Sequence, residues 1–189
     1  MARRYVVQVG DEVLRKKCDE VKSFNKELCV LLDDMKETVR AENGAGLAAP
    51  QIGLSIKLIV VDATPFAEEE PKCADFKKAL MNPEIYATEG EEWAFEEGCL
   101  SFPGLHEDVM RPETVHIRYQ DIDGTPHDEV YDGYVARILQ HECDHLNGKT
   151  FVDHLSSLRK TFLRRKLDNI VKGAVSVDYK MRFPNPKHR

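Results

Sequence analysis

Two histidines and a glutamate stand at a spacing that suits metal chemistry. Residues 141–145 read H-E-C-D-H, and the surrounding stretch 134–147 contains neither Gly nor Pro, which favours a helix. His141 and His145 would then lie one turn apart on the same helix face, so both imidazoles can reach one ion. Glu142 follows the first histidine and can accept a proton from a water on that ion without binding the ion itself. The motif predicts a helix that carries a catalytic metal site.

A catalytic metal site needs a third protein ligand and keeps one position open for water. The position at which metzincin proteases place their last histidine holds Phe151, and no glutamate follows His145, which excludes thermolysin-like enzymes. Asp153 and His154 stay open as the third ligand of another kind of metallopeptidase. A zinc-stabilised interaction domain with a closed four-ligand site is the non-enzymatic alternative.

Cys99 is the third ligand that the residue types favour. A thiolate with two imidazoles is a sound ligand set for a divalent ion. Gly98 lets the backbone approach the ion closely, and Pro103 stiffens the chain that follows. Cys143 lies two residues from each histidine, so its side chain points to another face of the helix and is a poor ligand.

A glycine-rich segment lies upstream of these residues. Residues 44–49 read G-A-G-L-A-A, which matches one form of a dinucleotide-binding turn. Such a turn follows a strand and opens a helix, whereas here a predicted helix comes first, and Pro50 and Gly53 break the helix that should follow. We therefore interpret the segment as extended backbone that approaches a ligand, with Gln51 as its amide donor. An ordinary helix-to-strand connection is the alternative.

Composition limits the class of protein. The 189 residues are 42% hydrophobic and 32% charged, as expected for one globular domain. No apolar run reaches the roughly 18 residues of a membrane span, and the first residues lack a secretory signal. Five cysteines without a C-x-x-C pair fit a reducing compartment, so we expect a cytoplasmic protein without a membrane partner. Charge is uneven, because residues 156–189 carry a net +8 and residues 1–155 a net −14.

Three helices are expected from the spacing of apolar residues. The first covers 23–40, the second covers 134–147 with Gly148 directly after its end, and the third covers 155–171. The third helix should bury five apolar side chains, those of Leu158, Phe162, Leu167, Ile170 and Val171.

Short β-branched runs bounded by turn residues predict the strands. A hairpin should join the last two of them, and an exposed loop is expected at 64–71. The expected strands are 56–61, 79–88, 91–95, 114–122 and 127–131. Strands bracketed by helices without regular alternation indicate an α+β fold: mainly antiparallel sheets around the central metal-binding helix, with a C-terminal helix.

Three segments in this order resemble the signature motifs of one family. G-A-G-L-A-A-P-Q at 44–51, E-G-C-L-S at 97–101 and Q-H-E-C-D-H at 140–145 resemble those of bacterial peptide deformylase, in the Gram-negative form with a C-terminal helix. The resemblance covers roughly residues 3–172. It implies a catalytic domain over 1–172 that includes the C-terminal helix, followed by a basic tail over 173–189.

The resemblance implies the reaction and the residues at its centre. The substrate would be the N-terminal formyl-methionine of a newly made protein, and hydrolysis of the formyl amide would release formate. Cys99, His141 and His145 would hold the ion, and Glu142 would take a proton from its water and deliver one to the leaving amine.

Further roles follow from the resemblance. Gln51 and the backbone N–H of Leu100 would stabilise the oxyanion. Gly46 would offer backbone hydrogen bonds to the peptide, and Glu97 would lie near the substrate and form a supporting ion pair with Arg111. A surface pair of little energetic weight is the alternative for the last two residues.

The methionine pocket is expected on the metal-facing side of the helix. Tyr134, Arg137 and Ile138 lie seven, four and three residues before His141, and Phe95 lies near the thiol ligand. The stem of Arg137 should line the pocket while its charged head reaches water. Core packing is the alternative for Ile138 and Phe95.

The resemblance implies one divalent metal ion as cofactor, with Fe²⁺ as the native ion. Zn²⁺, Ni²⁺ or Co²⁺ can replace it during purification, because the order of affinities favours late metals. The expected partner is the nascent formyl-Met polypeptide, and we do not expect DNA binding. The cationic face of the last helix suits docking on the ribosome. The alternative is that this face is simply a solvated surface. Its residues are Arg159, Lys160, Arg164, Arg165 and Lys166.

Overall fold

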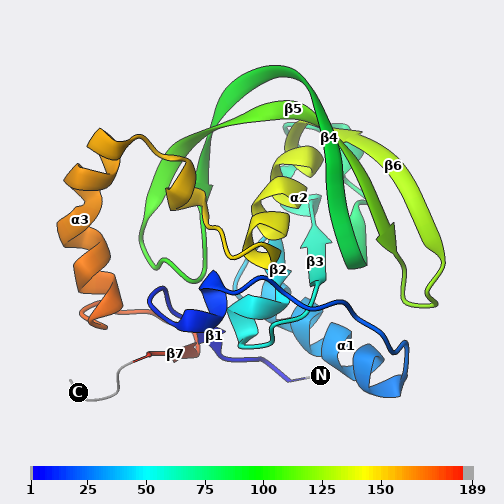
Figure 1. Cartoon of the computed structure of the whole chain (residues 1–189), viewed down its shortest axis with the longest axis horizontal. Helices are drawn as coiled ribbons and strands as arrows, with labels where there is room; N and C mark the ends of the chain where they lie inside the picture. Colours follow the sequence, from blue (N-terminus) through cyan, green and yellow to red (C-terminus); the bar gives the residue numbers. More distant parts are fainter. Residues whose placement is uncertain (1, 185–189) are drawn as a thin grey trace.

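The computed structural model describes residues 2–184 and has the α+β fold that the sequence predicts (Figure 1). Five antiparallel strands form one sheet in the order β2-β3-β4-β5-β6, and two short parallel strands, β1 and β7, form another. The strands are β1 Val6–Val7, β2 Gly46–Ala48, β3 Leu58–Asp62, β4 Lys77–Gly98, β5 His106–Gln120, β6 Pro126–Asp132 and β7 Met181–Arg182. The α-helices are α1 Lys26–Ala41, α2 Gly133–Leu146 and α3 Ser157–Val171.

The central strand β3 separates two apolar cores. Successive side chains of a strand point to opposite faces, and four of the five residues of β3 are buried. Ile59 and Val61 pack in the core that contains the apolar residues of α2. Leu58 and Val60 pack in the core that contains those of α1. The strand therefore fixes the position of both helices relative to the sheet.

Helix α2 is the element around which the site is built. Strands β4 and β5 curve together around it (Figure 1), and 11 of its 14 residues are buried. Its end agrees with the sequence prediction, because Asn147 caps it and Gly148 follows with a φ of 70°. A Cβ at Gly148 would lie 2.5 Å from the carbonyl oxygen of Arg15, so close packing as well as backbone conformation requires glycine there.

The long strand β4 replaces the two strands predicted at 79–88 and 91–95. The chain stays in the sheet through irregular pairing between Glu89 and Glu92, where Gly90 has a φ of 82°. Its partner β5 starts at His106, well before the predicted 114. The predicted hairpin between β5 and β6 is confirmed, with its turn residues held by the carboxylate of Asp121.

Helix α3 stands at the side of the body (Figure 1) and begins after a capping Ser156. The burial predicted for it is wrong at three positions, since Leu158, Phe162 and Val171 are 67%, 71% and 37% exposed. Ile170 is buried and Leu167 partly buried as predicted, and Leu163, which was not among the predicted positions, is buried too. The helix contacts the body along one narrow edge. Its apolar residues lie on two faces, so their spacing does not indicate which face is buried.

The chain after α3 folds back onto the body. Strand β7 pairs with β1, so the described residues of the predicted tail, up to 184, contact the start of the chain. Residues 185–189 of that tail lie outside the described residues. Within 2–184, no helix has the length and hydropathy to cross a membrane.

Candidate active site

Three side chains from two parts of the chain meet at the face of α2. The potential ligand atoms of Cys99, His141 and His145 all lie within 4.8 Å of one another. Cys99 directly follows β4, and its Sγ lies 3.4 Å from Nε2 of His145. Gly98 before it pairs with His106, and a Cβ at Gly98 would come within 2.5 Å of that imidazole ring. A larger residue at position 98 would force the His106 ring to move, so glycine lets β4 deliver the thiol to this point without displacing its neighbour.

The alternative third ligands are engaged elsewhere. Asp153 accepts hydrogen bonds from Arg15 and from the backbone N–H of Thr150. His154 lies 2.7 Å from the carboxylate of Asp144. Within residues 2–184, the only group of three or more metal-binding side chains is the one that contains Cys99. This arrangement does not support a metallopeptidase that uses Asp153 or His154, nor a closed four-ligand site.

Glu97 lies behind the first histidine. Its Oε2 is 2.8 Å from Nδ1 of His141, which leaves Nε2 of that ring to face Cys99. Both oxygens accept from the guanidinium of Arg111, at 2.7 and 3.0 Å. Burial works against the charge of Glu97, but the bonds from His141 and Arg111 hold the pKa of the carboxyl well below its usual range. Glu97 and Arg111 are 4% and 3% exposed, so the alternative of a weak surface pair is wrong.

Arg137 is buried, and the prediction that its head reaches water is wrong. Its guanidinium donates to Glu97 at 3.1 Å and to the carbonyl oxygens of Val109 and Trp93 at 2.9 and 2.7 Å. The charged carbon also lies 4.6 Å from the centre of the Trp93 ring. The arch formed by β4 and β5 supplies these acceptors for both terminal nitrogens, while the buried Nε has no partner within residues 2–184. Arg137 and Arg111 together neutralise the buried Glu97.

Glu142 is a buried carboxyl aimed into the site. It is 4% exposed, and burial raises its pKa to about 7. Its Oε2 has no hydrogen-bond partner in the described part of the chain. The backbone of β2 lies against the other oxygen, since a Cβ at Gly46 would come within 2.5 Å of Oε1. Glycine at 46 thus keeps the space in which this carboxyl can exchange a proton near neutral pH.

The donor set fits a divalent ion. Burial, with the charge of His141 nearby, lowers the pKa of His145 to about 3, so this imidazole is neutral and can ligate. Although burial opposes it, bonds to Cys99 and Glu97 raise the pKa of His141 well above its ordinary value. The thiol and Glu97 therefore favour positive charge at the His141 ring, where an ion on its Nε2 would supply that charge in place of a proton. A thiolate, two imidazoles and a carboxyl without a partner are the components of a catalytic zinc- or iron-type site.

Gln51 reaches the same point from the other side. It is 2% exposed and lies in the short 3₁₀-helix Ala49–Ile52, which follows β2. Its Oε1 accepts from the backbone N–H of Ala48 at 2.8 Å, so its amide nitrogen must point away. That nitrogen lies 3.3 Å from Sγ of Cys99. The position of Gln51 therefore places an N–H donor beside the thiol.

A cavity of about 940 Å³ opens above these groups. Phe95, Ile138 and Arg137 line it, as the sequence predicts. Phe66 lines it too, from the loop predicted at 64–71, and its role in the cavity was not predicted. Tyr134 stacks on Phe66 at 4.9 Å and packs edge-to-face on Phe95, so it lies behind the cavity wall. The motifs also missed a wall segment from the end of the chain, residues 176–179. The remaining lining includes Gly44, Ala45, Gly46, Gln51, Glu97, Cys99, Leu100, His141 and Glu142.

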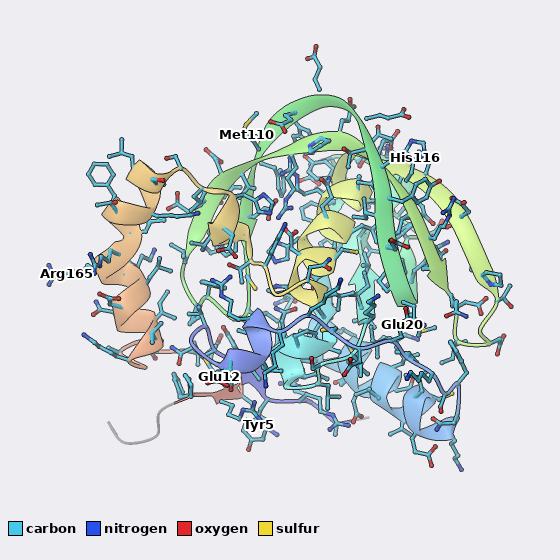
Figure 2. All side chains as sticks on the ribbon, viewed as in Figure 1. Tyr5, Glu12, Glu20, Met110, His116 and Arg165 are labelled. Atoms are coloured by element: carbon cyan, nitrogen blue, oxygen red, sulfur yellow. The ribbon has the colours of Figure 1, made fainter. Side chains whose placement is uncertain are left out.

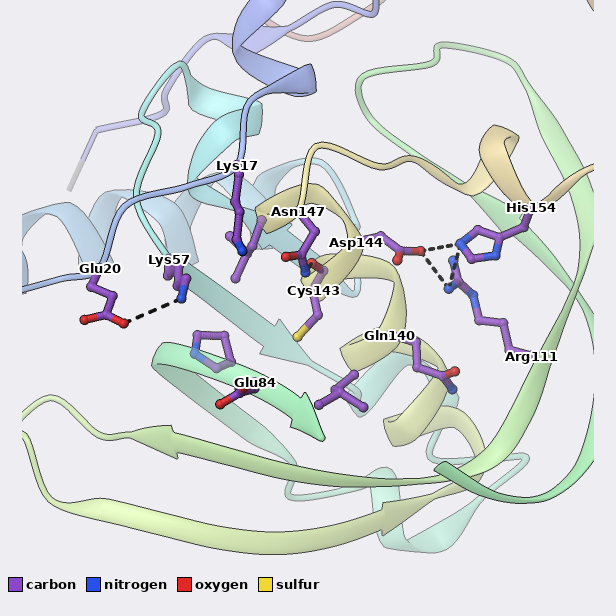
Figure 3. Close-up of a pocket in the computed structure, with 13 residues that line it drawn as sticks. Lys17, Glu20, Lys57, Glu84, Arg111, Gln140, Cys143, Asp144, Asn147 and His154 are labelled. Atoms are coloured by element: carbon purple, nitrogen blue, oxygen red, sulfur yellow. Dashed lines mark hydrogen bonds and ion pairs between the residues drawn. The ribbon is translucent and has the colours of Figure 1, made fainter. Parts of the chain in front are cut away.

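A second cavity of about 500 Å³ lies against the opposite face of α2 (Figure 3). Asp144 projects into it and pairs with Arg111 and His154, both at 2.7 Å. Cys143 also lines it, and burial raises the pKa of its thiol far above the usual range. Cys143 thus lies on a different face from the histidine cluster, as its position in the motif predicts.

A thiol and two imidazoles beside a buried carboxyl, at the floor of an open cavity, define a metal-dependent hydrolase. Comparison with known proteins gives the family. A sequence model of the polypeptide deformylase family matches residues 3–161. The chain is 43% identical to the peptide deformylase of Christiangramia forsetii over 96% of each chain, and 43% identical to that of Cytophaga hutchinsonii over 96% of this chain and 98% of that one.

Solved structures of peptide deformylases have the same fold as this chain. The crystal structure of a peptide deformylase from Legionella pneumophila superposes with a TM-score of 0.79 at 40% identity, covering 93% of this chain and 100% of that one. The structure from Thermotoga maritima gives 0.75 at 36% identity, over 82% and 99%. The chain belongs to the polypeptide deformylase family and has the metal-dependent activity of a peptide deformylase, which confirms the prediction from the three motifs.

Proposed function

We propose that this cavity binds the formyl-methionyl end of newly made polypeptides and hydrolyses the formyl amide to release formate. The observation that carries the proposal is the buried carboxyl of Glu142, with one oxygen free of partners, beside the cluster of Cys99, His141 and His145. No other described group combines a potential ligand set with a proton acceptor of pKa about 7.

Each residue has a distinct role in this reaction. Cys99, His141 and His145 would hold a divalent ion, which would supply Lewis acidity and lower the pKa of water at neutral pH. Glu142 accepts a proton from the attacking water as its oxygen bonds to the formyl carbon. The same carboxyl then gives a proton to the methionine nitrogen as the carbon–nitrogen bond breaks. Burial raises the pKa of Glu142 toward neutrality, which suits a group that must both take up and release a proton.

The oxyanion and the peptide are held by fixed donors. The amide nitrogen of Gln51 and the backbone N–H of Leu100 stabilise the oxyanion, each with a contribution that can reach roughly 3–4 kcal/mol. The backbone of Gly46, next to Glu142, bonds to the peptide. Glu97 acts through His141 rather than on the substrate, because both its oxygens already accept hydrogen bonds.

The methionine side chain occupies the apolar part of the cavity. Phe95, Ile138 and Phe66 contribute apolar surface, and the stem of Arg137 adds to it. Tyr134 supports the two aromatic rings from behind. Such a pocket fits a long, flexible, apolar side chain and offers it few polar partners.

The native ion of this proposal is Fe²⁺. The ligand set binds late metals more tightly, so protein purified in air should carry Zn²⁺, Ni²⁺ or Co²⁺ in part. The resemblance of the three motifs to the family is the ground for Fe²⁺, although Cys99, His141 and His145 would also hold Zn²⁺. The thiolate of Cys99 is open to oxidation, so the iron form should lose activity in air.

The proposed place of action is the cytoplasm, on chains leaving the ribosome. In α3, Arg159 is paired with Glu107 at 2.6 Å, which leaves the exposed Arg164, Arg165 and Lys166 for a polyanion (Figure 2 marks Arg165). Replacing these three residues by Glu should weaken co-sedimentation with ribosomes at low salt and leave turnover of short peptides intact. Unchanged co-sedimentation would count against ribosome docking.

Formate release from a formyl-Met tripeptide tests the proposed function. Anaerobic Fe²⁺ protein should release formate much faster than Zn²⁺ protein at equal occupancy, and it should leave the acetyl-Met version and the internal peptide bonds intact. Cleavage of an unblocked peptide without formate release would instead indicate a metallopeptidase. Equal rates for the two ions would refute the iron assignment alone.

A further inference from the structure

The chain turns back after α3 toward the entrance of the cavity. Gly173, with a φ of 71°, donates to the carbonyl of Ile170, and Ala174 donates to that of Asn169, which ends the helix. Val175 then packs against the core beneath α3. In Figure 1 this segment runs from the end of α3 toward β1.

The returning chain is fixed a few residues further on. Met181 and Arg182 of β7 pair with Val6 and Val7 of β1, and Met181 is 7% exposed. The guanidinium of Arg182 also lies 3.2 Å from the carboxylate of Asp11. Residues 176–179 are therefore held between two anchors, the end of α3 and the paired strands.

The segment between these anchors is part of the cavity wall. Ser176, Val177, Asp178 and Tyr179 all line the cavity that contains Cys99. The hydroxyl of Tyr179 lies 2.6 Å from the carbonyl oxygen of Leu100. A carbonyl can only accept, so the tyrosine is the donor.

This bond is one of three that the backbone carbonyls of residues 99–101 accept. The carbonyl of Cys99 accepts from the N–H of Phe102 at 2.9 Å, within the loop itself. The carbonyl of Leu100 accepts from Tyr179, and that of Ser101 accepts from the N–H of Val9 at 2.9 Å. Two of three successive carbonyls are thus held by the two ends of the chain, and those ends are paired with each other as β1 and β7.

We propose that Tyr179 is a positioning residue for deformylation, which holds the loop that carries the Cys99 thiol and the Leu100 N–H in place from the C-terminal segment. The inference rests on the proposed function, in which this N–H stabilises the oxyanion. A loop free to shift would misplace that donor, and donors act only when fixed where charge develops. The segment 174–182 therefore contributes to the geometry of the site.

Tyr179→Phe in the full-length holoenzyme tests this inference, because it removes the hydroxyl and keeps the ring. On a formyl-Met peptide kcat should fall about fivefold, the effect of one hydrogen bond, with KM changed by less than about twofold. Deuterium exchange of the amides in 99–102 should become several times faster. Tyr5→Phe is the matched control, because Tyr5 lies just before β1 and is 60% exposed. It should change neither quantity.

The outcomes separate this inference from the proposed function. Unchanged exchange at 99–102 in Tyr179→Phe would overturn it, as would an unchanged kcat or an effect on KM alone. A lower thermal midpoint with normal kcat and exchange would also overturn it, because the hydroxyl would then be merely structural. If the wild-type protein released no formate, the proposed function would fail, while the exchange measurement would still decide whether Tyr179 holds the loop.

Discussion

The two faces of α2 border two cavities of very different chemical character. The front face presents His141 and Glu142 to a cavity of about 940 Å³, with His145 fully buried one turn further along the helix. The back face presents Cys143 and Asp144 to a cavity of about 500 Å³ (Figure 3). In front, Oε2 of Glu142 is buried without a partner among residues 2–184. At the back, Asp144 is bonded to both Arg111 and His154.

The difference shows what marks a reactive site. A buried polar group without a partner costs about 1–3 kcal/mol, so proteins keep such groups where a ligand or a reacting molecule completes them. Charged residues alone mark no site, since the back cavity is also rich in them. Arg111 belongs to both sides, because its Nε bonds to Glu97 in front and its Nη1 to Asp144 behind. One guanidinium thus fixes the wall between the cavities.

The largest effect should come from replacing the cysteine of the front face, with the cysteine of the back face as the comparison. Cys99→Ala should lose both the metal and all detectable formate release, because two imidazoles alone bind an ion weakly. Cys143→Ala, the matched change on the back face, should keep both. Metal content per chain, measured alongside turnover, checks the pair. The opposite result would mean that the thiol of the back face is the ligand.

Glu142→Gln should separate metal binding from catalysis. The amide has nearly the same shape but cannot accept the proton, so kcat should fall by about 10³-fold while the metal content stays at the wild-type level. Turnover within roughly tenfold of wild type would remove Glu142 from its role as the base.

Glu97→Gln should have a smaller effect, on metal affinity. The neutral amide orients His141 less firmly and no longer balances two buried guanidinium groups, so affinity for the ion should fall about 10- to 100-fold. Competition with a chelator measures the change. Asp144→Asn is the control, because it likewise replaces a carboxylate by its amide, behind α2, and should leave affinity within about threefold. Equal losses of affinity in both variants would show that the two faces of α2 do not differ in their effect on metal binding.

The sequence predicts those parts of the site that depend on local spacing. Two histidines four residues apart must share a helix face, and Gly148 must follow the helix end, so α2 and its ligands could be placed without a structure. Cys99 was found from its residue type and from the glycine before it. The contact of Glu97 with His141 was not predicted, although the pair with Arg111 was.

The sequence did not predict features that depend on distant backbone. The guanidinium of Arg137 is buried because carbonyls of the β4–β5 arch accept from it, and no pattern in α2 indicates those acceptors. Phe162 is apolar and at helical spacing, yet it is 71% exposed because α3 meets the body along one edge. Tyr179 enters the cavity wall only because β7 pairs with β1.

Titration of metal-free protein with Fe²⁺ under anaerobic conditions tests the central claim most directly. The claim is that one ion at Cys99, His141 and His145, with Glu142 as base, carries the deformylation. Formate release from a formyl-Met peptide should be absent without the ion, rise linearly with added Fe²⁺ and stop rising at one ion per chain. Glu142→Gln should bind the same single equivalent and stay inactive. Activity in the metal-free protein, or a break point at two ions per chain, would contradict the account.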